Sequence, residues 1–201
     1  MININTLDFD KLEGLIPAVI IDSSTEQVLM LGFMNKESLQ KTLELKKVTF
    51  YSRSRKSLWT KGETSGNYLE VVRILPDCDN DTLLIYSRPL GNTCHTGNYS
   101  CFNIEKNNLK FLSQLFELIK TRKKELPEGS YTTKLFKTGA DRIIQKVGEE
   151  AVETIVAAKN RNKNEIVNEV SDLIYHLFVM LSEQNIELCE IIDVLEERHN
   201  K

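Results

Sequence analysis

The stretch "NIEKNNLKFLSQLFELIKTRKK", residues 103–124, marks the point at which the pattern of apolar residues changes along the chain. The apolar spacing from residue 108 onward predicts a helix. The basic residues at the end of this stretch suit the negative C-terminal end of a helix dipole. Before residue 103 the pattern is that of strands, so we place a domain boundary between residues 107 and 108. The apolar residues on one face of this helix are Leu109, Leu112, Leu115, Phe116 and Ile119.

The residues before the boundary have the pattern of short strands separated by turns. Five segments between residues 16 and 88 are rich in Val, Ile, Phe and Tyr, and several alternate in polarity: "IPAVIID", "QVLMLGFM", "KVTFYSR", "YLEVVRIL" and "DTLLIYSR". Residues 36–47 interrupt them with leucines at helical spacing. Residues 1–107 are therefore predicted to form a β-rich α+β domain.

The residues after the boundary keep the helical period to the end of the chain. "LPEGSYT" breaks the first helix, and helical patterns then cover residues 133–159, 163–184 and 186–198. In the helices predicted over residues 133–159 and 163–184 we expect apolar stripes that begin with Ile144 and Val170, respectively, and that face the core. Residues 108–201 are therefore predicted to form an all-α domain.

Composition narrows the classes of function. The chain has 201 residues, of which 41% are hydrophobic and 27% charged, and no apolar run approaches the roughly 20 residues that span a bilayer. The first residues lack the pattern of a secretory signal. A net charge of −3 disfavours nucleic-acid binding. We expect a cytoplasmic protein without nucleic-acid or membrane partners.

One segment gathers ligands for two kinds of metal. "DCDNDTLLIYSRPLGNTCHTGNYSC", residues 77–101, contains three aspartates, three cysteines and His95. In a reducing cytoplasm clustered cysteines indicate metal binding or catalysis, and thiolates suit zinc whereas carboxylates suit magnesium. The spacing of Cys78, Cys94 and Cys101 is not that of a paired zinc ribbon, and three thiolates leave a fourth position open for water.

The aspartates of this segment alternate with other residues. If the backbone is extended there, Asp77, Asp79 and Asp81 point to the same side and can converge on a cation. The alternative is that the cysteines are small buried residues and that the aspartates form a solvated turn.

A basic segment lies upstream of the aspartates. "YSRSRKSLWTKGETSGN", residues 51–67, interleaves cations with hydroxyls and two glycines, and such a segment can bind phosphate groups. The alternative is a charged hairpin loop, in which Trp59 is a packing residue. The candidate substrate-binding residues are Arg53, Arg55, Trp59, Lys61 and Ser65.

Carboxylates recur at short spacing in the helical half. Glu150 and Glu153 are three residues apart, as are Glu169 and Asp172, so each pair shares one helix face. Two antiparallel helices would bring these groups together, and a divalent cation would relieve their repulsion. The alternative is an ordinary acidic helix surface. His176, among apolar neighbours, is interpreted as a core histidine.

These segments together resemble a bifunctional enzyme of histidine biosynthesis, in which phosphoribosyl-AMP cyclohydrolase is fused to phosphoribosyl-ATP pyrophosphatase. The first half of the resemblance rests on "FYSRSRKSLWTKGETSGN", "DCDNDTLL" and "CHTGNYSCF", and the second on "GSYTTKLFKTGADRIIQKVGEEAVE" and "NEVSDLIYHLFVML". It covers nearly the whole chain from about residue 14. The sequence departs from the family at Asn98 and Tyr99, where many members carry a basic residue.

For the first domain the resemblance implies a homodimer that hydrolyses the adenine N1–C6 bond of phosphoribosyl-AMP. The zinc ligands correspond to Cys78, Cys94 and Cys101, with Cys78 supplied by the other subunit. The magnesium ligands correspond to the three aspartates, Asp77, Asp79 and Asp81. From its position and residue type, His95 is the candidate for moving the proton.

For the second domain the resemblance is to all-α pyrophosphohydrolases, and it implies release of pyrophosphate from phosphoribosyl-ATP. The magnesium ligands correspond to Glu150, Glu153, Glu169 and Asp172. Glu149 is a further ligand or the base, and Lys134 and Lys146 are candidate phosphate contacts. The C-terminal domain would then make the substrate of the N-terminal one.

Two other functions stay open at this point. One is a housekeeping nucleotide pyrophosphatase whose N-terminal domain only binds. The other is a non-catalytic scaffold that zinc stabilises, with a helical domain for partner proteins.

Overall fold

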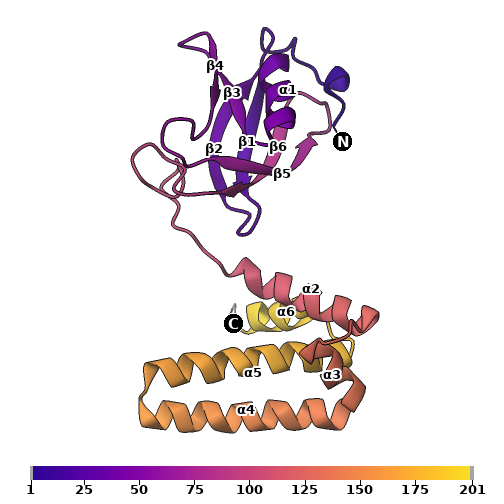
Figure 1. Ribbon diagram of the computed structural model, residues 1–201. Helices are drawn as coiled ribbons and strands as arrows, with labels where there is room; N and C mark the ends of the chain where they lie inside the picture. The colour runs from indigo at the N-terminus through magenta and orange to yellow at the C-terminus, as the bar shows by residue number, and fades with distance from the viewer. Residues whose placement is uncertain (1, 200–201) are drawn as a thin grey trace. The chain divides into compact units, whose positions relative to one another are not determined.

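The structure, a computed structural model, describes residues 2–199 and divides into two compact units, Met1–Phe111 and Leu112–Lys201 (Figure 1). Strands β1 to β6 and helix α1 belong to the first unit, and the second consists of helices. This arrangement confirms the predicted fold class. Among the described residues no helix is both long and apolar enough to cross a membrane.

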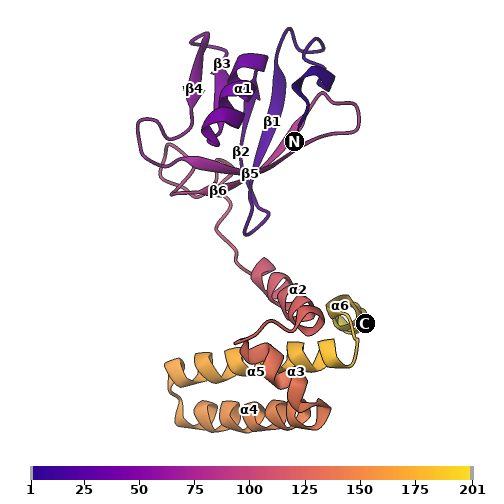
Figure 2. The same ribbon diagram turned by 45° about the vertical axis from the view of Figure 1, so that its right-hand side comes forward.

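Four strands of the N-terminal unit form one sheet in the order β2-β1-β6-β5. The two central strands, β1 and β6, are parallel, and the outer pairings are antiparallel. Because β5 and β6 are antiparallel neighbours, the aspartate segment becomes the short loop that joins them at one end of the sheet (Figure 2). The strands are β1 (Ile16–Asp22), β2 (Val28–Met34), β5 (Leu69–Pro76) and β6 (Leu83–Pro89).

A hairpin and a helix complete this unit. Strands β3 (Thr49–Ser52) and β4 (Ser57–Thr60) pair with each other, and α1 (Lys36–Leu45) precedes them. A capping box between Asn35 and Ser38 begins α1. A short 3-10 helix, η1 (Ile4–Thr6), lies near the N-terminus. The sequence pattern did not predict β4, because its four residues are too few to alternate.

The core of this unit lies between the sheet, α1 and the hairpin. Phe50 on β3 is packed so closely against Gly32 on β2 that a Cβ atom there would lie 2.4 Å from the ring. The close approach therefore requires glycine on that strand. The largest fully buried side chains of the unit are Ile16, Ile20, Leu29, Met34, Leu39, Phe50, Leu69, Leu83 and Ile85.

Helices α4 and α5 form an antiparallel hairpin in the C-terminal unit, as Figures 1 and 2 show. A buried cluster from four helices fixes α2 and α3 on it, with Phe116 of α2 packed edge-on against Phe178 of α5. The helices are α2 (Lys110–Glu125), α3 (Tyr131–Thr138), α4 (Ala140–Asn160), α5 (Lys163–Glu183) and α6 (Leu188–His199).

The structure corrects the prediction of one helix over residues 133–159. Gly139 adopts φ 92° and ends α3 where α4 begins, so the segment is two helices. A left-handed φ is strained for residues with a Cβ atom, and glycine at this position makes the break possible.

The apolar stripe expected to be buried on α4 is also corrected. Ile144 and Ile155 are 50% and 67% exposed, whereas the buried face of α4 carries Ile143, Glu150 and Ala157. The helix thus turns its carboxylate face toward α5 and leaves an apolar face uncovered within one chain.

A buried polar cluster holds the cysteine loop on the sheet. Asp22, at the end of β1, is 1% exposed and accepts hydrogen bonds from the Tyr99 hydroxyl (2.8 Å) and the Ser24 hydroxyl (2.6 Å). Burial opposes ionisation of Asp22, but the Ser24 and Tyr99 donors outweigh it and lower its pKa. Tyr99 lies between two of the cysteines, so this cluster anchors their loop.

We predict that Asp22→Asn destabilises the N-terminal unit in a pH-dependent way. Because the folded-state pKa is lowered, the ionised carboxylate stabilises the fold above about pH 4, the unfolded value, and loses this effect as pH falls through the folded value. Urea unfolding followed by the fluorescence of Trp59, the single tryptophan, is the measurement.

The difference in unfolding free energy between wild type and Asp22→Asn should be about 1–3 kcal/mol at pH 7 and should shrink below about pH 4. Tyr99→Phe, which removes one donor, should show a smaller difference with the same trend. A difference that does not change with pH would contradict the role of the ionised carboxylate.

Candidate functional site

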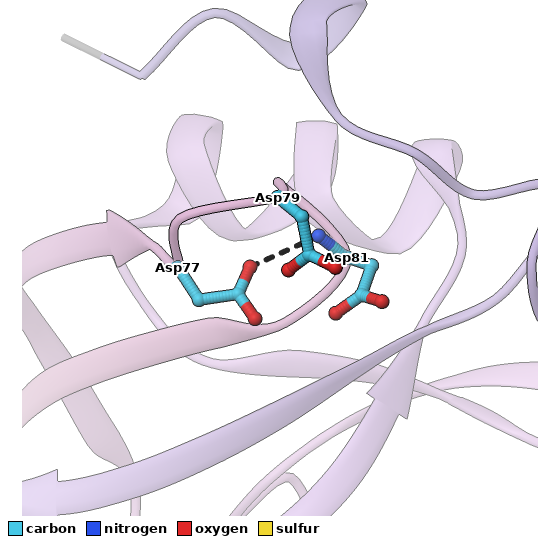
Figure 3. Close-up of side chains that lie close together, drawn as sticks. All are labelled: Asp77, Asp79 and Asp81. Carbon is cyan, nitrogen blue, oxygen red and sulfur yellow. Dashed lines mark hydrogen bonds between the residues drawn. The ribbon is translucent and has the colours of Figure 1, made fainter.

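Three aspartates converge in the loop between β5 and β6. One carboxylate oxygen from each of Asp77, Asp79 and Asp81 lies within 4.8 Å of the others. Of the two conformations considered from the sequence, the loop adopts the turn and not the extended backbone: Asn80 has φ 62°, and Asp77 Oδ1 accepts from the backbone N–H of Asp81 at 3.0 Å (Figure 3). The carboxylates therefore meet by folding around the turn.

A lysine from the N-terminal segment offsets part of the negative charge of this cluster. The Lys11 ammonium donates to Asp79 Oδ2 and to Asp81 Oδ2, both at 2.7 Å. The Asp8 backbone N–H donates to the Asn80 carbonyl at 2.8 Å and holds the segment against the loop. Hydrogen bonding to Lys11 lowers the pKa of Asp81. Sequence reasoning missed Lys11, because nothing near it in the sequence indicates a contact nearly 70 residues away.

Two of the three predicted zinc ligands lie side by side. The thiols of Cys94 and Cys101 are close enough for each to influence the pKa of the other. The Thr96 hydroxyl donates to Cys94 Sγ at 3.0 Å, and this bond lowers the pKa of the Cys94 thiol. Burial raises the pKa of Cys101, and the neighbouring Cys94 adds to this effect. Two adjacent thiols of this kind suit a soft cation that binds them as thiolates.

The third predicted ligand is elsewhere in the chain. Cys78 is exposed in the aspartate loop, and among residues 2–199 no group of three potential ligands within 4.8 Å contains a cysteine. His95 is exposed, and its Nδ1 atom lies 3.8 Å from Cys94 Sγ, next to the thiol pair. One chain by itself thus places an imidazole beside Cys94, but among the described residues it gathers no set of three ligands that includes a thiol.

The side chain of Lys61 is buried close to the thiol pair. Only 8% of Lys61 is exposed, and burial lowers its pKa, whereas Cys101 and Cys94 partly oppose this shift when ionised. A cation beside two thiols stabilises their thiolate forms.

The other candidates for substrate binding in this unit lie around the β3–β4 hairpin. Arg53 stacks on the Phe33 ring at 3.8 Å, and Trp59 packs against the buried ring of Phe50 at 5.6 Å. Arg55 lies over the Trp59 ring at 5.9 Å. Ser65 is exposed. The hairpin therefore presents two guanidinium groups supported by aromatic rings.

The helical carboxylates converge between α4 and α5. Oxygens of Glu150, Glu169 and Asp172 lie within 4.8 Å of one another, and Glu153 interacts with Glu169. The residue spacing of three on each helix and the antiparallel hairpin produce this cluster. Desolvation raises the pKa of Glu169, and the neighbouring carboxylates, Glu153 first, raise it further. Such mutual repulsion is relieved when a divalent cation binds.

Basic side chains surround Glu149 and Glu150 on α4. Lys146 Nζ lies 3.0 Å from Glu149 Oε2 and 2.9 Å from Glu150 Oε1, so both predicted acids share it. Arg142 and Gln145 each donate to Glu149 Oε1 at 2.8 Å. Hydrogen bonding, chiefly from Lys146, lowers the pKa of Glu149. Lys134 on α3 is exposed.

Comparisons with known proteins agree with the division of the chain into a β-rich unit and a helical unit. A family model described as Phosphoribosyl-AMP cyclohydrolase matches residues 30–103, and one described as Phosphoribosyl-ATP pyrophosphohydrolase matches residues 112–199. The thiol pair and the aspartate cluster fall in the first match, and the helical carboxylates fall in the second.

Relatives match over nearly the full length. The "Histidine biosynthesis bifunctional protein HisIE" of Escherichia coli (strain K12) is 53% identical over 96% of this chain and 95% of its own. The protein of the same name from Buchnera aphidicola is 53% identical over 97% of this chain and 91% of its own. That from Bacteroides thetaiotaomicron is 53% identical over 96% of each chain. The chain belongs to the family of bifunctional histidine biosynthesis proteins, with a phosphoribosyl-AMP cyclohydrolase domain followed by a phosphoribosyl-ATP pyrophosphohydrolase domain.

Proposed function

We propose that this chain catalyses two successive hydrolyses of histidine biosynthesis. The helical domain cleaves phosphoribosyl-ATP to phosphoribosyl-AMP and pyrophosphate, and the β-rich domain then opens the adenine N1–C6 bond of phosphoribosyl-AMP. The observation that carries this proposal is the separation of ligand types: a thiol pair lies in one unit and an oxygen-only cluster in the other. Two matched domain families support it independently.

In the β-rich domain Cys94, Cys101 and Cys78 of a second copy would hold zinc. When bound, zinc supplies a water of lowered pKa and polarises the atom that the water attacks. His95 is within reach of the same place and would transfer the proton that ring opening requires. Lys61 would help to keep the thiols ionised and contact the substrate.

The aspartate cluster of the same domain would hold magnesium. Three converging carboxylates fit a hard cation, and the Lys11 ammonium already lies on two of them as a cation would. Arg53, Arg55, Trp59 and Ser65 line the hairpin and would contact the phosphates, ribose or base of the substrate. Their cations suit a substrate that carries two phosphorylated riboses.

In the helical domain Glu150, Glu153, Glu169 and Asp172 would hold magnesium, which neutralises the charge of the triphosphate. The exposed Lys134 would contact phosphate, and Lys146 would do so while bridging Glu149 and Glu150. With three donors, Glu149 is a weaker base than a free glutamate, so we assign it the positioning of Lys146 and Arg142.

Domain limits at residues 1–107 and 108–201 fit the two family matches, which end at 103 and begin at 112. We place the protein in the cytoplasm, where reducing conditions keep cysteines free for zinc, and all four cysteines are free in this structure.

A homodimer would complete the thiol site and cover apolar surface. Cys78 does not reach the thiol pair within one chain. In the helical domain Val152, Ile155 and Val156 form a continuous exposed stretch of α4, at 59%, 67% and 51% exposure. A second copy would bury this surface.

We predict that the two activities separate by mutation. Cys94→Ser should lower ring opening by at least about a hundredfold and leave pyrophosphate release unchanged, because metal ions contribute several kcal/mol to such reactions. Glu153→Gln should do the reverse when phosphoribosyl-AMP is supplied for ring opening. Both rates are measured with each purified variant, and Cys189→Ser is the matched cysteine control. Loss of both activities in either variant would contradict the division.

Lys11→Met should destabilise the N-terminal unit when no divalent metal is present, because the ammonium then no longer offsets the repulsion of Asp79 and Asp81. Added Mg²⁺ should raise the melting temperature of the variant by more than that of the wild type, since only in the variant does it replace a missing cation. Exposed Lys41, changed to Met, is the control. An equal response to Mg²⁺ in both proteins would place the cation elsewhere.

Mixing two inactive variants tests the shared site. Cys78→Ser and Cys94→Ser should each lack ring opening, but a hybrid dimer regains one intact set of thiols. After unfolding and refolding an equal mixture, we expect about a quarter of wild-type activity, because about half of the dimers are hybrids with one active site each. No recovery from a mixture that sediments as dimers would show that one chain supplies all three thiols.

A further inference from the structure

His176 is buried at the centre of the helical carboxylate site. It lies on α5, is 4% exposed, and its Nδ1 atom lies 2.9 Å from the backbone carbonyl of Asp172 and 3.8 Å from Glu150 Oε1. Its other ring nitrogen, Nε2, lies 3.1 Å from the Tyr131 hydroxyl. The sequence suggested a core histidine, and it is buried, but its neighbours are the residues of the proposed magnesium site.

The contacts assign the protons of this network. A carbonyl oxygen only accepts, so Nδ1 of His176 carries the hydrogen and donates to Asp172. In the neutral ring Nε2 then accepts from the Tyr131 hydroxyl. The same nitrogen lies 3.8 Å from Glu150 Oε1, so the ring lies between the backbone of Asp172 on α5 and the carboxylate of Glu150 on α4.

Tyr131 is itself held in place. Its ring stacks on Tyr175 with centroids 6.2 Å apart, and the Tyr175 hydroxyl is 2.8 Å from that of Thr132. Arg122 of α2 donates to Thr132 at 3.1 Å. The imidazole is therefore contacted from α3 by a side chain that also stacks on Tyr175 of α5.

Both nitrogen neighbours of Glu150, from Lys146 and His176, face the same carboxylate oxygen. Lys146 Nζ donates to Oε1 at 2.9 Å, and His176 Nδ1 faces Oε1 as well. Oε2 is then the oxygen that we assign to a cation. Glu150 is 4% exposed. Its neighbours therefore orient its carboxylate and offset part of the free-energy cost of burying the charge.

We propose that His176 and Tyr131 are positioning residues that hold Glu150 and Asp172 at the separation and orientation needed for divalent-cation binding. This inference rests on the proposed function of the helical domain and adds two residues to its site. Carboxylates that repel one another need such support while no cation is bound. Residues that orient metal ligands in this way typically change metal affinity by about 10–100-fold when mutated.

The test is Mn²⁺ binding, measured by loss of the free-ion electron paramagnetic resonance signal. The parent protein is the full chain with Asp79→Asn and Asp81→Asn, which leaves the helical site as the carboxylate cluster under study. We expect His176→Leu to weaken Mn²⁺ binding by about 10–100-fold and Tyr131→Phe by about tenfold. His176→Asn, whose amide N–H can still donate to the Asp172 carbonyl but which has no nitrogen to contact Tyr131, should weaken Mn²⁺ binding by about tenfold, as Tyr131→Phe does.

Tyr175→Phe is the matched control, because it also removes a partly buried hydroxyl but not a contact to a ring nitrogen of His176. It should lower the melting temperature and leave Mn²⁺ affinity unchanged. A second readout uses Tyr131→Phe in the otherwise wild-type chain: the Mg²⁺ concentration for half-maximal pyrophosphate release should rise while ring opening by the same protein stays constant.

Two outcomes overturn this inference in different ways. If the parent binds Mn²⁺ and folded Tyr131→Phe and His176→Leu bind it equally well, the positioning role is wrong and the proposed function stands. If the parent binds no Mn²⁺ at the helical site, the proposed magnesium site fails and the positioning role fails with it. Tyr131→Phe keeps the test decisive if His176→Leu does not fold, because Tyr131 is 50% exposed.

Discussion

Repulsion between carboxylates held within 4.8 Å of one another is the constraint around which both units are organised. The two units meet it in different ways. The β-rich unit brings a lysine from residue 11 onto Asp79 and Asp81, so that one of the three negative charges of its cluster is offset without a metal. The helical unit gives Lys146 to Glu149 and Glu150 and leaves Glu169 repelled by its neighbours, with a raised pKa. The second cluster therefore has the greater electrostatic need for a cation.

The need to offset repulsion between carboxylates is also reflected in the structure next to each cluster. A turn between antiparallel strands can converge three short side chains, but only if an N-terminal segment closes over it, as the bond from Asp8 to Asn80 does. An antiparallel helix hairpin can bring longer glutamate side chains together. The helix face that carries these glutamates is then not available for apolar residues. This is why Ile144 and Ile155 are exposed in one chain, and why we assign that surface to a second copy.

The sequence was sufficient for the fold class and for the pairing of ligand types with domains. Periodicity separates strands from helices, and residue spacing places Glu150 and Glu153 on one face. It was not sufficient where contacts join distant segments: Lys11 meets Asp81 across 70 residues, and Tyr131 meets His176 across 45. It also failed where one residue sets the backbone. Asn80 turns the aspartate loop that alternation suggested was extended, and Gly139 divides a helix that the apolar period continues through.

The central claim is that one chain carries out both hydrolyses in order, and a single time course tests it most directly. Purified protein is mixed with phosphoribosyl-ATP, Mg²⁺ and trace Zn²⁺, while pyrophosphate and the ultraviolet absorbance change of ring opening are followed together. The account predicts both signals, with pyrophosphate appearing first and ring opening following after a lag. Pyrophosphate without ring opening, with zinc bound, would reduce the thiol site to a structural one, and the absence of both signals would contradict the account as a whole.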